Sequence, residues 1–311
     1  MKNLLSIESL APEEIARIVE LSATMKATRG RHAEHPLRHQ CWALIFSKSS
    51  TRTRVSFEVG IRELGGDVMF LTANDIQLGR GEPIKDTARV MGRMLHGAVI
   101  RTFEQNEVEE FAQFSGIPTI NALTDSEHPC QIFADLFTIQ EKLGGFENKT
   151  VCFIGDGACN VARSWIWAAA KMNFTLRIAA PENYQPDRAV LDAARNAAAT
   201  SSKSGDAGRV QIFTNPAAAA HGADVLYTDV WVSMGKEAES QFRLAQLAGY
   251  QINRELLREA APGALVMHCL PAYREKEITE DVFEENAGTI FDQAENRLHT
   301  QKAILSLLAK G

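Results

Sequence analysis

The chain has 311 residues, of which 45% are hydrophobic and 23% are charged, and its formal net charge is −6. This length exceeds a single compact core, so two α/β domains are expected. The acidic balance argues against a nucleic-acid or membrane surface, and no stretch approaches the roughly 20 apolar residues of a membrane span. The five cysteines are scattered without a paired motif, which argues against a disulfide framework or a zinc site and fits a reducing cytoplasm.

The most informative stretch is an apolar strand, 41–46, that runs through a polar turn into an amphipathic helix. Ser50 or Thr51 is expected to cap this helix. The first turn combines backbone N–H groups, hydroxyls and the guanidinium groups of Arg52 and Arg54. A helix N-terminus and arginine both favour anions, so the stretch suits a phosphate. An ordinary capped helix with solvated arginines is the competing interpretation.

Apolar runs of strand length alternate with amphipathic helical patterns along the whole chain. This alternation predicts two doubly wound parallel-sheet α/β domains joined by interdomain helices. The predicted strands are 41–46, 67–71, 97–100, 117–120, 150–154, 176–180, 209–213, 223–229 and 264–268. The predicted helices include one that begins at Pro12, one over 83–95, one that begins at Pro129, an alanine-rich one within 186–209 and a C-terminal one.

Polar residues stand where the strands of the first half end. Parallel sheets bind ligands beyond the carboxyl ends of their strands. Arg101 follows the third predicted strand, and His128 and Gln131 stand at the mouth of the helix after the fourth. They are therefore expected at the same edge of the sheet as Ser50. A surface ion pair for Arg101 and a helix-capping role for His128 are the competing interpretations.

The second half opens with a strand and a glycine-containing turn, Gly155–Val161. The turn resembles a dinucleotide fingerprint, but Asn160 stands in place of the third glycine and no acidic residue follows the next strand. These departures argue against NAD binding. Asn160 can instead hydrogen-bond a small polar ligand. Asp229 ends a later strand, and Ser233 and Met234 lie in a long connection that either closes over a ligand or leads into the next helix.

Several histidines and cysteines are expected to have no functional role. His32, His35 and His39 lie in a basic loop with no other ligands nearby, and they are expected to be solvated rather than to bind a metal. Cys152 lies within an apolar strand and is expected to be core. Cys159 is expected to be a neutral filler.

Three motifs stand in order along the chain: Ser50-Thr-Arg-Thr-Arg54, His128-Pro-Cys-Gln131 and His268-Cys-Leu-Pro271. Together they resemble the aspartate/ornithine carbamoyltransferase family, and the resemblance runs the length of the chain. Cys269 and Ser233-Met-Gly235 are similar to the ornithine branch. The residues after the third motif depart from the usual His-Arg-Gly of the family, although Arg274 is kept.

The resemblance implies a role for each matching residue. The residues implied to take part in the reaction are Arg52, Arg101, His128 and Cys269, with Cys269 not assumed to be a nucleophile. The residues implied to bind carbamoyl phosphate are Ser50, Thr51, Arg52, Thr53, Gln77, Arg101, His128, Gln131, Cys269, Leu270 and Arg297. The residues implied to bind ornithine are Asn160, near its carboxylate, Asp229 and Ser233, near its α-amine, and Met234.

The resemblance also implies domain functions and an assembly. Residues 1–142 are expected to bind carbamoyl phosphate and residues 143–291 to bind ornithine, with the C-terminal helix 292–311 packed back on the first domain. The expected assembly is a cytoplasmic homotrimer in which Gln77 reaches a neighbouring site. The Leu270–Pro271 bond resembles one that is cis in the family.

The implied reaction moves the carbamoyl group from carbamoyl phosphate to the δ-amine of L-ornithine, giving L-citrulline and phosphate in arginine biosynthesis. It requires no metal, nucleotide or other cofactor. A sibling transferase that uses another amine is the nearest alternative, against which Asp229 and Ser233-Met-Gly235 argue. A protein that binds carbamoyl phosphate without turnover is the alternative from another class.

Overall fold

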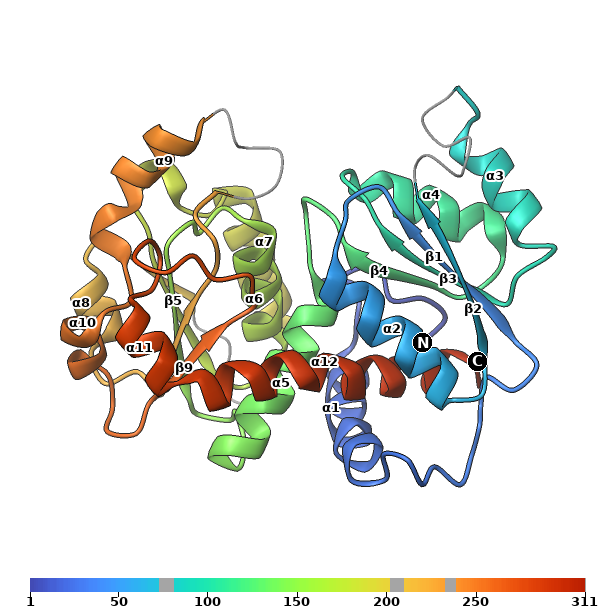
Figure 1. Cartoon of the computed structure of the whole chain (residues 1–311). Coiled ribbons are helices and arrows are strands. Elements are labelled where there is room, and N and C mark those ends of the chain that lie inside the picture. The colour runs from blue at the N-terminus through green and yellow to red at the C-terminus, as the bar shows by residue number, and fades with distance from the viewer. Residues whose placement is uncertain (73–80, 202–209, 233–238, 311) are drawn as a thin grey trace. The chain divides into compact units, whose positions relative to one another are not determined.

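The computed structural model describes residues 1–72, 81–201, 210–232 and 239–310 (Figure 1). The chain divides into two compact units, one of Met1–Phe137 with Glu295–Gly311 and one of Thr138–Ala294. Each unit is built on a parallel β-sheet, so the prediction of two parallel-sheet α/β domains is confirmed. The unit boundaries fall inside two helices, α5 (Pro129–Leu143) and α12 (Ala287–Leu308).

The first unit has a four-stranded sheet in the order β2-β1-β3-β4. Its remaining elements are α1 (Pro12–Ala27), β1 (Cys41–Phe46), α2 (Thr51–Glu63), β2 (Asp67–Thr72), α3 (Ile84–Met91), β3 (Gly97–Arg101), α4 (Gln105–Ser115) and β4 (Thr119–Leu123). The chain adds β2 on one side of β1 and β3 on the other. The order of the strands therefore reverses between β1 and β3, which is where parallel sheets bind ligands.

Helices cover both faces of the first sheet (Figure 1). Successive residues of a strand point to opposite faces, so Ala43 and Ile45 share one face and pack in an apolar cluster with Phe111 of α4. On the other side, α2 buries Phe57 and Ile61. β1 is apolar and buried along nearly its whole length, and the polar turn after it leads directly into the first turn of α2 at the carboxyl end of the strand.

Two predicted boundaries in the first unit are wrong. The helix predicted over 83–95 ends at Met91, because Gly92 is a weak helix former that packs closely on the chain: a Cβ there would lie 1.9 Å from the carbonyl oxygen of Ser115. The strand predicted over 117–120 instead spans Thr119–Leu123. Pro118 precedes it and lacks the N–H that the hydrogen-bonded ladder requires.

The second unit has a five-stranded sheet in the order β7-β6-β5-β8-β9. Its strands are β5 (Thr150–Ile154), β6 (Thr175–Ala179), β7 (Val210–Phe213), β8 (Val225–Thr228) and β9 (Leu265–His268). Its helices include α6 (Asn160–Lys171), α7 (Arg188–Ser201), α8 (Pro216–Ala220), α9 (Ser240–Leu247), α10 (Arg254–Glu259) and α11 (Glu280–Glu285). Here the strand order reverses between β5 and β8.

Aromatic rings fill one face of the second sheet. Tyr227 of β8 stacks on Phe153 of β5 with centroids 5.6 Å apart, and Trp165 of α6 meets Tyr227 edge-on at 5.5 Å. The apolar cluster of the other face includes Phe283 of α11 and Leu256 of α10. In the described part of the chain, no helix combines the length and the apolar character that crossing a membrane requires.

Candidate active site

The first turn of α2 stands just beyond β1 in the first unit. Ser50 is extended, with φ −162°, and its Oγ accepts a hydrogen bond from the N–H of Thr53 at 3.3 Å, so Ser50 rather than Thr51 is the cap. Thr53 is fully buried, Arg52 is half-buried and Thr51 is exposed. The positive end of the helix dipole therefore lies at the edge of the sheet where the strand order reverses.

Arg101 and His128 lie at the carboxyl-end side of two neighbouring strands, β3 and β4. Arg101 is the last residue of β3, and the register with β4 shifts between Ile100 and Arg101, an irregularity of the kind that redirects a side chain. His128 directly precedes α5. Both are buried, with exposed fractions of 6% and 5%, so the interpretation of Arg101 as a surface ion pair is wrong.

The imidazole of His128 lies in a dry, cationic environment. Burial holds the pKa of His128 well below its usual range, and the guanidinium groups of Arg297 and Arg101 lower it further. His128 is therefore neutral at pH 7. A neutral imidazole can donate one hydrogen bond without adding a third positive charge to the site.

Arg297 of α12 connects this group to α2 and α5. Its Nη2 donates to Thr53 Oγ1 at 2.8 Å, and its Nη1 donates to Gln131 Oε1 at 3.3 Å. Gln131 Nε2 in turn donates to Asp135 Oδ1 at 2.8 Å, which fixes the orientation of the amide. This group combines two buried arginines, a neutral histidine and a capped helix N-terminus, which are chemical features that favour an anion.

Lys48 is a buried cation near this group that the sequence analysis missed. Its ammonium forms an ion pair with Asp125 and lies 4.2 Å from the ring centroid of Phe103. Its position two residues after an apolar strand was the available signal, because a side chain there lies at the edge of the sheet.

Asp229 and Cys269 meet at the carboxyl ends of β8 and β9 in the second unit. The thiol of Cys269 donates to Asp229 Oδ1 at 2.8 Å, and the N–H of Val230 donates to the same oxygen at 2.7 Å. Burial raises the pKa of Asp229, while His268 and the hydrogen bond from Cys269 act in the opposite direction. A cationic group beside this half-buried carboxyl would stabilise its charged form.

A tight turn follows β9. Leu270 has φ 60° and the Leu270–Pro271 bond is cis, as the resemblance implied. The N–H of Leu270 donates to His268 Nδ1 at 2.9 Å, so the proton of the ring lies on Nε2, which donates to Glu277 at 3.2 Å. This pair of hydrogen bonds holds the turn that carries Cys269 and Leu270.

Asn160 is the first residue of α6, next to the switch point of the second sheet. Cys159 is not the neutral filler that was expected, because its Sγ accepts a hydrogen bond from the N–H of Ala162 at 3.4 Å and caps α6. A thiol is a weak acceptor and an unusual cap, so this role was not predictable from the residue type.

Asp156 and Arg243 form a buried ion pair that the sequence analysis also missed. Asp156 accepts a hydrogen bond from the N–H of Ala158 at 3.0 Å, within the turn before Asn160. Arg243 of α9 donates through Nε to the carbonyl of Trp231 at 2.7 Å, two residues after Asp229. The pair therefore ties together the two segments that carry Asn160 and Asp229.

Three predicted site residues, Gln77, Ser233 and Met234, lie outside the described residues. Over the described ranges, no three His, Cys, Asp or Glu side chains are grouped so as to hold a metal ion. The other predicted site residues fall into two groups, one in each unit. Those of the first unit are Ser50, Thr51, Arg52, Thr53, Arg101, His128, Gln131 and Arg297, and those of the second are Asn160, Asp229, Cys269 and Leu270.

Two family models match this chain. Residues 2–141 match the carbamoyl-P binding domain of aspartate/ornithine carbamoyltransferase, and residues 147–308 match its Asp/Orn binding domain. The chain belongs to the aspartate/ornithine carbamoyltransferase family. The recognition of this family from three short motifs is confirmed.

Relatives and solved structures of the family agree along the full chain. An ornithine carbamoyltransferase from Akkermansia muciniphila is 58% identical over 99% of this chain and 98% of its own length. The solved ornithine carbamoyltransferase from Pyrococcus furiosus is 42% identical with a TM-score of 0.92, covering 100% of this chain and 97% of its own. The anabolic ornithine carbamoyltransferase from Campylobacter jejuni is 39% identical with a TM-score of 0.92, covering 100% and 99%.

Proposed function

We propose that this chain transfers the carbamoyl group of carbamoyl phosphate to the δ-amine of L-ornithine, giving L-citrulline and phosphate in arginine biosynthesis. The observation that carries the proposal is the buried group of Arg101, His128 and Arg297 at the capped N-terminus of α2. It occurs in a chain that is 58% identical to an ornithine carbamoyltransferase.

In this proposal the phosphate of carbamoyl phosphate binds at the first turn of α2. Backbone N–H groups and the hydroxyls of Ser50, Thr51 and Thr53 donate to its oxygens, and Arg52 balances its charge. Arg297 already donates to Thr53 Oγ1 at 2.8 Å, so it approaches the same oxygens from α12. The charge-assisted hydrogen bonds of guanidinium groups to phosphate are among the strongest that proteins make.

The carbamoyl group occupies the adjacent part of the site. Arg101 and the neutral His128 donate to the carbonyl oxygen, which becomes an oxyanion when the amine attacks. Gln131 binds the carbamoyl amine from the other side. Because the surroundings are dry, each donor contributes more than it would in water, and loss of one donor in comparable sites costs about 3–4 kcal/mol.

Ornithine binds in the second unit in this proposal. Asn160 hydrogen-bonds its carboxylate, and Asp229 with Ser233 and Met234 holds the end that carries the α-amine. Cys269 and Leu270 supply further contacts to carbamoyl phosphate. The carboxyl of Asp229, whose pKa is raised, suits this role, because an arriving ammonium stabilises its charged form.

The transfer itself needs a neutral δ-amine, although an alkylamine of this kind has a pKa near 10.4 in water. Its nitrogen forms a bond to the carbamoyl carbon, and the bond from that carbon to the bridging oxygen of the phosphate breaks. The proton of the amine passes to the departing phosphate. The thiol of Cys269 donates a hydrogen bond to Asp229, so Cys269 acts as a contact and not as a nucleophile.

The assembly is proposed to be a cytoplasmic homotrimer in which Gln77 reaches a neighbouring site. Supporting this, β2 is an edge strand of the first sheet and carries the exposed Met69, and α2 exposes Val55. Exposed apolar residues next to an unpaired strand edge are typical of a surface that another chain covers. Gln77 lies shortly after β2 in the chain.

The test is an assay of phosphate release and carbamoylated product with carbamoyl phosphate and four amines: ornithine, acetylornithine, aspartate and putrescine. Citrulline from ornithine alone is the expected result. Turnover with another amine would retain the phosphate site and discard the assignment of Asp229. Binding of carbamoyl phosphate without turnover of any amine would overturn the enzymatic proposal.

A further inference from the structure

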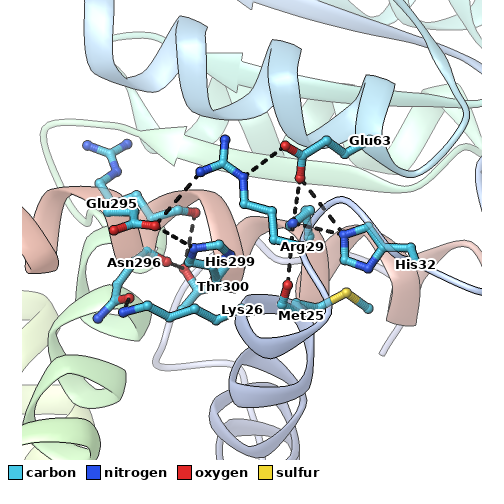
Figure 2. Close-up of polar contacts among 11 residues, drawn as sticks. Met25, Lys26, Arg29, His32, Glu63, Glu295, Asn296, His299 and Thr300 are labelled. Atoms are coloured by element: carbon cyan, nitrogen blue, oxygen red, sulfur yellow. Dashed lines mark hydrogen bonds and ion pairs between the residues drawn. The ribbon is translucent and has the colours of Figure 1, made fainter.

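A second buried polar cluster lies in the first unit, at the opposite end of α2 from the proposed phosphate site (Figure 2). Its centre is Lys302 of α12, whose side chain is 0% exposed. The ammonium donates to Glu63 Oε2 at 2.6 Å, to His32 Nε2 at 3.0 Å and to the carbonyl of Met25 at 3.5 Å. Three acceptors therefore face the three N–H groups of Lys302.

His32 is a neutral partner of Lys302. Thr28 Oγ1 donates to the carbonyl of Thr24 at 2.7 Å, so its contact with His32 Nδ1 at 3.0 Å has the ring as donor. The lone pair of Nε2 is then free to accept from Lys302. Burial and the nearby Lys302 lower the pKa of His32. The expectation that His32 is solvated is wrong, because its side chain is only 7% exposed under residues from distant parts of the chain.

Glu63 carries the negative charge of the cluster. Besides Lys302 it accepts from Arg29 Nε at 3.1 Å, and Arg29 also lies 3.8 Å from the carboxylate of Glu295 (Figure 2). Burial opposes ionisation of Glu63, but the hydrogen bonds from Lys302 and Arg29 prevail and its pKa is lowered. The cluster thus joins α1 and the turn after it to the last residue of α2 and to α12.

The same two helices, α2 and α12, form the proposed phosphate site. At one end of α2, Thr53 accepts from Arg297 at 2.8 Å, and at the other end Glu63 accepts from Lys302. Between them a Cβ at Gly60 would lie 3.3 Å from Lys302 Cγ, so the absence of a side chain there lets α12 approach closely. The contact between α2 and α12 therefore has a polar anchor on each side of Gly60.

Because α12 is one continuous helix, a displacement at Lys302 also displaces Arg297. Arg297 and Lys302 are five residues apart, about one and a half turns of a continuous helix. A small rotation or slide of α12 would move the guanidinium group away from Thr53 and Gln131. Displacements of about 1 Å caused by distant changes can lower rates about 100-fold.

We propose that Lys302 is a positioning residue for carbamoyl phosphate: with Glu63 and His32 it fixes α12 on α2 so that Arg297 reaches Thr53 and Gln131. The inference rests on the proposed function, because its effect is measured through the use of carbamoyl phosphate. A purely structural ion pair would stabilise the fold without any specific effect on this substrate.

The first test is Lys302→Met, which removes the ammonium and keeps an unbranched chain beside Gly60. We expect the KM for carbamoyl phosphate and the inhibition constant of inorganic phosphate each to rise about tenfold, with the KM for ornithine changed less than about twofold. Lys310→Met is the matched control, because Lys310 is 61% exposed and pairs with Glu34 at 3.2 Å on the surface. The Lys310→Met variant should have the same KM values and inhibition constant as the wild-type protein.

The second test is epistasis with Arg297. In an Arg297→Met background, Lys302→Met should raise the KM for carbamoyl phosphate by less than about twofold more, because its effect acts through the missing guanidinium group. If Lys302→Met fails to fold, Glu63→Gln replaces it, since the amide keeps an acceptor oxygen near Lys302 and a smaller rise of about threefold is expected.

The outcomes separate the inference from the proposed function. Folded Lys302 or Glu63 variants with an unchanged KM for carbamoyl phosphate, or additive effects with Arg297→Met, would overturn the positioning role. If the protein without substitutions does not use carbamoyl phosphate, the proposed function itself would be overturned.

Discussion

The two units place polar side chains at the same point of the same kind of sheet, yet the two groups have opposite charge. Beside the switch point of the first sheet stand the buried cations Arg101 and Arg297, and beside that of the second stands the half-buried acid Asp229. The topology therefore decides where a site forms, because parallel strands end together at one edge. The side chains that follow the strands decide which ligand it accepts.

Burial acts in the same sense on both groups and drives each titratable residue toward its neutral form. In the first unit the neighbours reinforce the effect, since both arginines lower the pKa of His128 further. In the second unit they oppose it, since His268 and Cys269 counter the raised pKa of Asp229. His128 is thus held firmly neutral, whereas the opposing contributions at Asp229 make its protonation sensitive to a nearby charge.

The largest effect on catalysis should come from removing a cation of the first site. Arg101→Met should lower kcat/KM for carbamoyl phosphate several hundred-fold, about 3–4 kcal/mol, because it deletes a buried donor aimed at developing negative charge. The measurement is steady-state kinetics with each substrate varied in turn. Arg62→Met is the control, as Arg62 is 59% exposed on α2. Equal losses for ornithine and carbamoyl phosphate binding would undo the division of roles between the units.

The next prediction concerns the free energy of unfolding and a buried ion pair of the second unit. Arg243→Met leaves the carboxylate of Asp156 buried without its partner, which typically destabilises a protein by about 3–5 kcal/mol. Urea unfolding measures this loss, and adding Asp156→Asn should restore part of it. Arg254→Met is the control, because its ion pairs are exposed and each is worth less than about 1 kcal/mol. Similar midpoints for the two single variants would contradict the role of the buried pair.

Removing the acid of the second site should affect one substrate alone. Asp229→Asn keeps the shape and an acceptor oxygen but cannot carry charge, so kcat/KM for ornithine should fall about 100-fold, within the 2–5 kcal/mol range for broken buried charge pairs. The inhibition constant of inorganic phosphate should stay unchanged. Glu259→Gln, an exposed change on α10, serves as the control. A parallel loss of phosphate binding would show that the two sites are not separable.

The features of both sites that were predictable from sequence are those with a local signature. Ser50 stands between an apolar strand and an amphipathic helix, so its capping role follows from neighbours within a few residues. Arg101 and Asp229 were placed because Arg101 ends β3 and Asp229 directly follows β8, and both strands are recognisable from sequence. Because parallel strands end at one edge of the sheet, residues from distant parts of the chain could be placed together without knowledge of their contacts.

The features that were missed are pairings over long distances in sequence. Arg243 lies 87 residues after its partner Asp156, and Lys302 lies 270 residues after His32. Each of these side chains alone is typical of a solvated surface, and only the packing of helices from distant segments buries it. A single sequence carries no pattern for such a match, so the supporting contacts appear only in the structure.

The smallest predicted effect is on the pH dependence of the free energy of unfolding, to which His128 and Asp229 should contribute with opposite signs. The folded pKa of His128 lies below its unfolded value of about 6.5, so the folded state binds fewer protons and the free energy of unfolding rises as pH increases toward that value. The folded pKa of Asp229 lies above its unfolded value of about 3.9, so there the free energy of unfolding falls as pH increases above that value. Each unit of pKa shift corresponds to about 1.4 kcal/mol.

Urea unfolding between pH 4 and pH 8 tests these opposite slopes. His128→Gln should flatten the rise of the free energy of unfolding below pH ~6.5, and Asp229→Asn should remove the fall above pH ~3.9. His221→Gln is the control for histidine titration, since His221 is 80% exposed. If both site variants altered the slope in the same direction, the two sites would not differ in charge preference, because burial of a base and burial of an acid must shift protons in opposite senses.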